Sequence, residues 1–213
     1  AGWCGTGVAA AAMFGADPER PYARPPLSKG LWLGRPEEQI WLPEVPALEL
    51  HLGRRVVALD TKAREVRDEA GGVRRCEERV RASGGAPRWR ASGGGRVVYY
   101  RTLQDYRRLR AAKGRRVVVV GGGFIGSEIA ASLAASGKEV TMVFPEAAVG
   151  ARNYPADLAR AITDVFEEKG VRVLAKDTVA AIEERGDRTA VRTAGGHELL
   201  ADVVVAGLGI RPD

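Results

Sequence analysis

The clearest pattern of hydrophobic positions lies in the second half of the chain. Residues 115–120, RRVVVV, include a continuous β-branched run, which is typical of a strand buried on both faces in a parallel sheet. Apolar residues then recur at helical spacing from Ile125 until Gly137, and residues 139–144, EVTMVF, form the next strand-like run. A strand, a glycine turn, a helix and a strand within about 30 residues predict a right-handed βαβ unit.

The pattern continues with a second helix and then changes to a shorter period. Helical spacing predicts a helix between Pro155 and Gly170, and residues 171–175 read as a third parallel strand. Three short segments separated by Gly-containing turns, TVAAIEE, TAVRT and HELLA, predict a β-meander, and the run 202–209 predicts another buried strand. The expected fold class is α/β, a Rossmann-like dinucleotide-binding domain in which a parallel sheet is joined by a β-meander.

Glycine and proline interrupt the middle of the chain. The turns GGAP (84–87), SGGG (92–95) and KGRR (113–116) mark a loop-rich region with a boundary near residue 113. We therefore expect two domains, which cover residues 1–112 and 113–213.

Cysteine and histidine are too scarce for several kinds of chemistry. Cys4 and Cys76 lie far apart, so the sequence contains no C-x-x-C redox pair, no disulfide framework and no zinc spacing. With two histidines, His51 and His197, a histidine-centred catalytic cluster or metal site is also disfavoured. Redox chemistry is therefore expected to come from a bound cofactor, and we assign no catalytic residue and no metal ligand.

Charge and hydropathy limit the partners that the chain can have. The net charge of +6 is concentrated between Arg74 and Arg116, which suits an acidic partner or a nucleic acid. Regularly interleaved aromatic residues are missing from this stretch, which favours a solvated surface over a nucleic-acid groove. No apolar run approaches the about 20 residues of a membrane span, and no signal sequence is visible. We expect a cytoplasmic protein without a membrane partner, represented by a fragment.

A glycine motif stands where the first predicted strand meets the first predicted helix. Gly121, Gly123 and Gly126 have G-x-G-x-x-G spacing, and this context confirms the motif as a dinucleotide-binding loop. The glycines are expected to serve a tight turn, a close approach to pyrophosphate and close helix packing, respectively. The alternative is a tight turn without a ligand. The loop residues expected to bind the cofactor are Gly121, Gly122, Gly123, Phe124, Ile125 and Gly126.

An acidic residue follows the second predicted strand. Glu146 stands 20 residues after Gly126, where a carboxylate accepts hydrogen bonds from an adenosine ribose. A carboxylate there repels a 2′-phosphate, which favours NADH over NADPH, while Arg152 could soften that preference. The alternative for Glu146 is a solvated loop carboxylate.

Seven segments in a characteristic order carry a family resemblance. The segments are ERPYARPPLSKGLW, VVALD, ASGGAPR, YYRTLQDYRRLR, GGGFIGSEIA, VTMVFPE and VVVAGLGIRPD. They resemble the FAD-dependent pyridine nucleotide-disulfide oxidoreductase superfamily, and within it the ferredoxin-reductase-like and apoptosis-inducing-factor-like branch, which lacks the catalytic disulfide. The resemblance implies that residues 1–112 are a partial FAD-binding α/β domain and that residues 113–213 are the NAD-binding domain.

The resemblance also implies further cofactor contacts. FAD would be contacted by Arg24, Lys29, Val57 and Arg101, and Gly209 would lie near the nicotinamide half of NAD. Glu128 in the first predicted helix would pair with Lys29 beside the flavin ring, within ~4 Å. The alternative for Glu128 is a first-turn carboxylate that stabilises the helix dipole.

The flavin half departs from the family pattern in three ways. Gly5, Gly7 and Ala10 have G-x-G-x-x-A spacing, but little strand precedes them and the following helix is reduced to residues 8–12. The segment RCEERVRASGG (75–85) contains arginines where an apolar strand is expected. The sequence also stops before the second flavin motif of the family.

The function expected from these features is a flavin-dependent NADH oxidoreductase. A hydride would pass from NADH to FAD, and electrons would continue to a ferredoxin or another acceptor. Two alternatives remain open, an NAD-binding module without turnover and a basic nucleic-acid-binding protein, of which the second is disfavoured.

Overall fold

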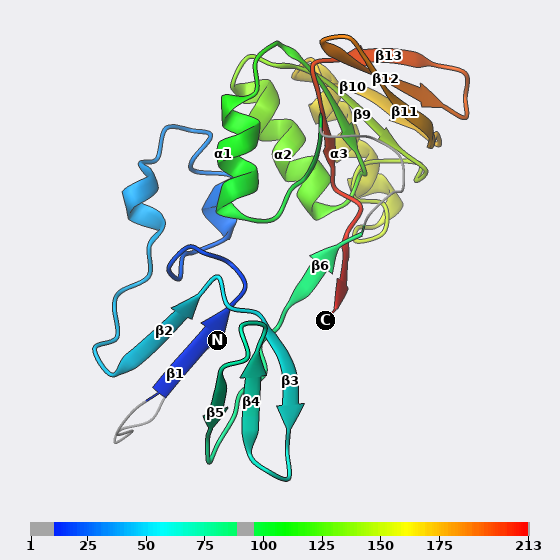
Figure 1. Ribbon diagram of the computed structural model, residues 1–213. Coiled ribbons are helices and arrows are strands. Elements are labelled where there is room, and N and C mark those ends of the chain that lie inside the picture. Colours follow the sequence, from blue (N-terminus) through cyan, green and yellow to red (C-terminus); the bar gives the residue numbers. More distant parts are fainter. Residues whose placement is uncertain (1–10, 89–95, 213) are drawn as a thin grey trace. The chain divides into compact units, whose positions relative to one another are not determined.

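A computed structural model describes residues 11–88 and 96–212, which form two compact units (Figure 1). The first unit contains the chain up to Ala23 and the segment Glu37–Gly84. The second unit contains the segment Arg24–Pro36 and the chain from Gly85 onward. The predicted boundary near residue 113 lies inside the second unit. The assignment of residues 1–112 to flavin and 113–213 to nicotinamide binding stays a prediction.

The first unit contains a pair of parallel strands and a small antiparallel sheet. Ala11 and Ala12 belong to a strand that pairs with Leu48 and Glu49, so the helix predicted over residues 8–12 is wrong at its described end. Alanine has a high intrinsic helix propensity, but pairing with a neighbouring strand overrides it here. The elements are β1 (Ala11–Gly15), η2 (Glu37–Ile40), β2 (Leu48–Leu52), β3 (Val56–Asp60), β4 (Glu65–Asp68) and β5 (Val73–Arg75).

The second unit is built on a five-stranded parallel sheet with the order β10-β9-β8-β14-β7. Its central strands are almost completely buried, as the continuous valine runs predicted. The strands are β7 (Val97–Tyr99), β8 (Arg116–Val120), β9 (Glu139–Phe144), β10 (Arg172–Ala175) and β14 (Val203–Ala206). The helices are α1 (Leu103–Ala111), α2 (Phe124–Ala135) and α3 (Ala156–Glu168). The predicted α/β fold class and βαβ unit are confirmed.

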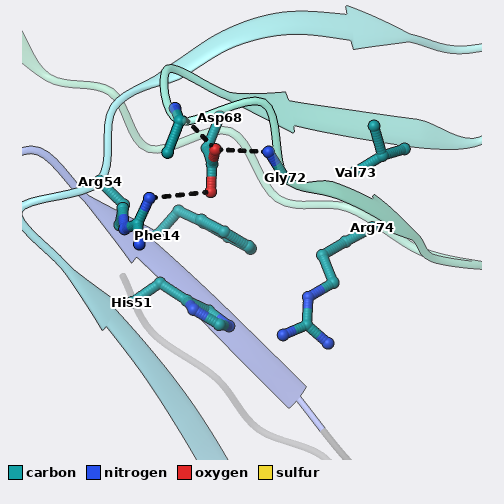
Figure 2. A pocket seen from close by; sticks show the side chains of 8 residues that line it. Phe14, His51, Arg54, Asp68, Gly72, Val73 and Arg74 are labelled. Carbon is teal, nitrogen blue, oxygen red and sulfur yellow. Dashed lines mark hydrogen bonds and ion pairs between the residues drawn. The ribbon is translucent and has the colours of Figure 1, made fainter.

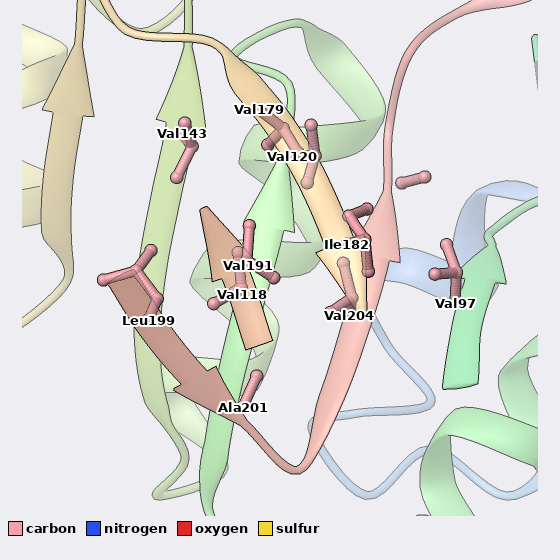
Figure 3. Packing of buried hydrophobic residues seen from close by; sticks show 11 residues of the cluster. Val97, Val118, Val120, Val143, Val179, Ile182, Val191, Leu199, Ala201 and Val204 are labelled. Carbon is pink, nitrogen blue, oxygen red and sulfur yellow. The ribbon is translucent and has the colours of Figure 1, made fainter. Parts of the chain in front are cut away.

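The predicted β-meander is also present, and it covers one face of the parallel sheet. It consists of β11 (Val179–Arg185), β12 (Arg188–Thr193) and β13 (Glu198–Ala201), which pair antiparallel. Val191 from the meander packs with Val118 and Val204 from the sheet in one buried hydrophobic cluster (Figure 3). Because each unit of apolar area removed from water is stabilising, this cluster fixes the meander on the sheet.

The segment Arg24–Pro36 packs on the parallel-sheet unit through buried aromatic residues. It contains η1 (Pro25–Ser28) and Trp32, whose indole N–H donates to the carbonyl of Leu27 at 2.9 Å. The ring of Trp32 meets the edge of Tyr106 on α1, with 5.4 Å between ring centroids. Burial raises the pKa of the neighbouring Tyr100 phenol above its usual range.

A second link within this unit is the antiparallel pair β6 (Gly85–Pro87) and β15 (Ile210–Pro212).

Candidate dinucleotide site

The glycine loop joins the carboxyl end of β8 to the first turn of α2. Gly121 has a φ of +117°, a region that favours glycine, and a Cβ there would also overlap the carbonyl of Gly207. A Cβ on Gly126 would overlap the carbonyl of Gly121, and one on Gly122 would lie 2.7 Å from the ring of Phe144. The protein itself therefore requires glycine at these three positions.

Gly123 differs from its neighbours, because no described residue requires glycine there. Its φ is −82°, and a Cβ would meet no atom of residues 11–88 and 96–212 within 4 Å. It is the N-cap of α2 and offers no side-chain cap, so the first N–H groups of the helix point outward without intrahelical partners. The open space and the positive end of the helix dipole form a cradle that fits a pyrophosphate.

Gly207 is a site residue that sequence reasoning missed. Its N–H donates to the carbonyl of Val120 at 2.8 Å, and a Cβ there would lie 2.8 Å from the amide nitrogen of Gly126. Gly207 therefore lets β14 and the glycine loop approach closely. The sequence feature that could have indicated Gly207 is its position directly after a buried strand, two residues before Gly209. Gly209 itself has a φ of +81°, and its carbonyl accepts from Arg88 at 3.0 Å.

Glu146 and Arg152 lie in the loop at the carboxyl end of β9, the strand next to β8. The guanidinium Nε of Arg152 is 2.5 Å from a carboxylate oxygen of Glu146, whose side chain is 19% exposed. The same loop contacts the glycine loop, because the N–H of Gly150 donates to the carbonyl of Gly122 at 2.8 Å. The fold therefore brings the predicted ribose and pyrophosphate residues to one edge of the sheet.

The predicted pair of Lys29 and Glu128 is confirmed. Their ammonium nitrogen and carboxylate Oε1 are 2.7 Å apart, and the other carboxylate oxygen accepts from the hydroxyl of Ser28 at 2.6 Å. One turn later on α2, the hydroxyl of Ser132 donates to the carbonyl of Ser28 at 2.6 Å. Both oxygens of Glu128 thus have cationic or hydroxyl partners, which removes any need for it to face the anion cradle.

Of the remaining predicted flavin contacts, Arg24 and Arg101 lie side by side, whereas Val57 belongs to the other unit. The guanidinium of Arg24 donates to the carbonyl of Arg101 at 3.0 Å, within the second unit. Val57 lies on β3 in the first unit and is 57% exposed. The G-x-G-x-x-A residues Gly5, Gly7 and Ala10 lie outside the described residues.

The first unit contains a pocket of its own, of about 330 Å³ (Figure 2). The rings of Phe14 and His51 stack along one side, with 4.3 Å between their centroids. Arg54 and Arg74 also line the pocket, and Asp68 accepts from the N–H of Gly72 at 2.8 Å. Val57, the predicted flavin contact of this unit, does not line the pocket.

The described residues contain neither a metal-binding cluster nor a membrane-spanning helix. Among residues 11–88 and 96–212, no group of three or more His, Cys, Asp or Glu is placed to hold a metal ion. None of the helices in these ranges is long and apolar enough to span a membrane.

A glycine cradle between a parallel strand and a helix, with an acidic residue after the next strand, defines a Rossmann-type dinucleotide-binding protein. The chain matches the pyridine nucleotide-disulphide oxidoreductase family over residues 6–213 and belongs to that family. It falls in the ferredoxin-reductase-like branch, as the sequence motifs predicted.

Two curated relatives illustrate the similarity. The chain is 36% identical to the ferredoxin–NAD(+) reductase component of an anthranilate 1,2-dioxygenase system from Burkholderia cepacia, over 94% of this chain and 52% of the relative. It is 32% identical to peroxisomal monodehydroascorbate reductase 4 of Arabidopsis thaliana, over 94% of this chain and 47% of the relative. The chain thus spans about half the length of the curated relatives that it matches.

Solved structures give the same result. A ferredoxin reductase from Rhodopseudomonas palustris superposes with a TM-score of 0.87 at 30% identity, over 94% of this chain and 52% of that chain. Putidaredoxin reductase, solved in a covalent complex with putidaredoxin, superposes with a TM-score of 0.86 at 28% identity, over 93% of this chain and 52% of that chain.

Proposed function

We propose that the chain is the nicotinamide-binding part, with some of the flavin-binding part, of an FAD-dependent NADH oxidoreductase that passes electrons to a ferredoxin or a similar acceptor. The observation that carries the proposal is the open cradle at Gly123, where no described part of the chain gives a steric reason for glycine. Family membership and relatives named as ferredoxin and monodehydroascorbate reductases support it.

The residues of the cradle have separate tasks in this proposal. The first N–H groups of α2 would hold the pyrophosphate of NADH, because they are unpaired donors at the positive end of a helix. Glu146 would accept hydrogen bonds from the adenosine ribose. Bound together, the two cofactors would supply hydride and electron transfer, which side chains alone cannot provide.

The flavin side of the proposal rests on a partial set of residues. Arg24, Lys29 and Arg101 of the second unit would contact FAD. Glu128 would hold the ammonium of Lys29 in place, because its carboxylate is itself fixed by Ser28. The role of this chain is therefore to bind and orient the cofactors.

The finer parts of the proposal concern the choice of cofactor and acceptor. The largely buried carboxylate of Glu146 supports a preference for NADH over NADPH, since it would repel a 2′-phosphate. A ferredoxin acceptor is supported by the names of the relatives, and the basic balance of the chain suits an acidic partner. A cytoplasmic location stays a prediction.

The test is a visible spectrum of the purified chain followed by titration with NADH. We expect flavin absorbance near about 450 nm that bleaches when NADH is added without oxygen. A colourless protein that binds NADH would instead be an NAD-binding module without turnover. A protein that binds neither flavin nor NADH, but binds DNA with a steep salt dependence, would overturn the proposal in favour of nucleic-acid binding.

A further inference from the structure

The loop between β9 and α3 is partly buried and is held by several hydrogen bonds. Ala148, Val149 and Gly150 are buried, and the N–H of Val149 donates to the hydroxyl of Thr163 on α3 at 2.9 Å. The carbonyl of Gly150 accepts from the N–H groups of Asn153 and Tyr154, at 2.8 and 3.1 Å. These bonds make the loop a fixed support for the residue at its end, Tyr154.

The ring of Tyr154 packs directly against Gly150, where a side chain would overlap it. Its φ of +73° favours glycine, and a Cβ there would lie 2.6 Å from the Tyr154 ring. The same residue donates to the carbonyl of Gly122 in the glycine loop. Tyr154 therefore sits on the residue that joins the two loops.

Tyr154 in turn contacts the first residue of α2. Its ring meets the ring of Phe124 edge to face, with centroids 6.2 Å apart and an interplanar angle of 87°. Both rings are well exposed, Phe124 to 56% and Tyr154 to 38%. Phe124 directly follows Gly123, so an ordered and exposed aromatic pair stands beside the anion cradle.

We propose that Tyr154 is a positioning residue for the dinucleotide, which holds the ring of Phe124 as a wall beside the pyrophosphate cradle. The inference rests on the proposed function, because it takes an NAD-type dinucleotide as the ligand. Without Tyr154 the Phe124 side chain would gain freedom to change rotamer, because its ring is more than half exposed and would lose the aromatic contact. An ordered wall lowers the entropy that is lost when the ligand binds.

The experiment is a calorimetric titration of the full chain with NADH and with ADP-ribose, which shares the pyrophosphate but lacks nicotinamide. Tyr154→Ala is compared with Tyr154→Phe, Phe124→Ala and the double alanine variant. Val165→Ala, at an exposed position on α3, controls for the loss of exposed apolar area.

We expect Tyr154→Ala to raise the Kd of both ligands by the same factor, about 3- to 10-fold, which is the range of an aromatic pair. Tyr154→Phe should restore wild-type binding, because it keeps the ring. The double variant should bind as the weaker single variant does, because Tyr154 acts through Phe124. The thermal midpoints of the variants without ligand should stay close to that of the wild type.

Other outcomes distinguish a failure of the role of Tyr154 from a failure of dinucleotide binding. If the wild type binds NADH and Tyr154→Ala binds it equally well, the inference is wrong while the proposed function stands. Additive losses in the double variant would also overturn it, because Tyr154 would then act independently of Phe124. If the wild type binds neither NADH nor ADP-ribose, both the proposed function and the inference fail.

Discussion

At the scale of single residues, the four glycines around the cradle divide into two kinds. Gly126 is required by the fold, because a Cβ would overlap the carbonyl of Gly121. Gly123 is not, because a Cβ would enter open space. Substitutions at these two positions should therefore affect different properties of the protein.

We predict that Gly123→Ala leaves folding intact but weakens NADH binding, since its methyl group occupies the cradle. Gly126→Ala should lower the free energy of unfolding by about 1–3 kcal/mol, the usual cost of overpacking. Thermal unfolding and NADH titration of both variants measure the two effects. Unchanged NADH affinity in Gly123→Ala would show that the open space does not receive the ligand.

A second prediction at this scale concerns Glu146. Glu146→Ala should weaken NADH binding about 10-fold or more, because charge-assisted hydrogen bonds are worth about 1.5–3 kcal/mol. It should also improve NADPH binding, because Arg152 loses its present partner and becomes available to a 2′-phosphate. The ratio of the two dissociation constants is the measurement.

The matched control for Glu146 is Glu139→Ala, at the opposite end of the same strand. Glu139 pairs with Arg115 at 3.7 Å and is well exposed, so its loss should leave both affinities unchanged. Equal losses for NADH and NADPH in Glu146→Ala would contradict a role in the choice between them.

At the scale of elements, Asp202 joins the start of β14 to the start of β8. Its carboxylate accepts from the N–H groups of Arg116 and Arg115 at 2.9 and 2.8 Å. The hydrogen bond from Arg116 is the largest of the contacts that lower the pKa of Asp202, and the one from Arg115 adds to it. Because the folded-state pKa lies below the unfolded one, Asp202 stabilises the fold above the unfolded pKa, and this contribution is lost as pH falls through the folded pKa.

We predict that Asp202→Asn lowers the free energy of unfolding by about 1–2 kcal/mol at pH 7. The difference from the wild type should begin to shrink as pH falls below about 4, the ordinary pKa of an unfolded Asp, and should be lost once pH falls through the lower folded-state pKa of Asp202. Urea unfolding at several pH values measures both effects. A difference that stays constant down to the lowest pH would contradict the ionic contribution.

Elements whose signal is local were predictable from the sequence, and those that depend on distant partners were not. The valine run of β8, the helical spacing of α2 and the alternation of β11–β13 match the structure closely. The short strand β7 joins the parallel sheet through its pairing with β14, more than 100 residues later in the sequence. The docking of Arg24–Pro36 on this unit likewise depends on buried aromatic contacts that no local pattern shows.

The candidate site follows the same division. Gly121, Gly123, Gly126 and Glu146 could be found because their spacing along the chain reports the geometry of a βαβ turn. Gly207 and Tyr154 could not, because each acts through contact with a loop that precedes it by at least 28 residues. The pair of Lys29 and Glu128 was predicted from the family resemblance. The spacing of the two residues along the chain would not have predicted it.

At the scale of the whole molecule, the two units differ in how well their strands are buried. Strands β8 and β14 of the second unit are almost wholly buried, whereas every residue of β3 and β5 in the first unit is exposed. Amide hydrogens exchange more slowly where opening requires the loss of many buried apolar contacts. The second unit should therefore be the more strongly protected part of the chain.

We predict slow hydrogen exchange in β8 and β14, and fast exchange in β3–β5. NADH at about 100 times its Kd should stabilise the unit that binds it by about 2.7 kcal/mol. Exchange through global opening of the second unit should then slow about 100-fold, while β3–β5 stay unchanged. Mass spectrometry of exchanged peptides, with and without NADH, resolves the two units. Slower exchange of β3–β5 on addition of NADH, without a change in β8 and β14, would place the dinucleotide in the first unit and contradict the site described at Gly123.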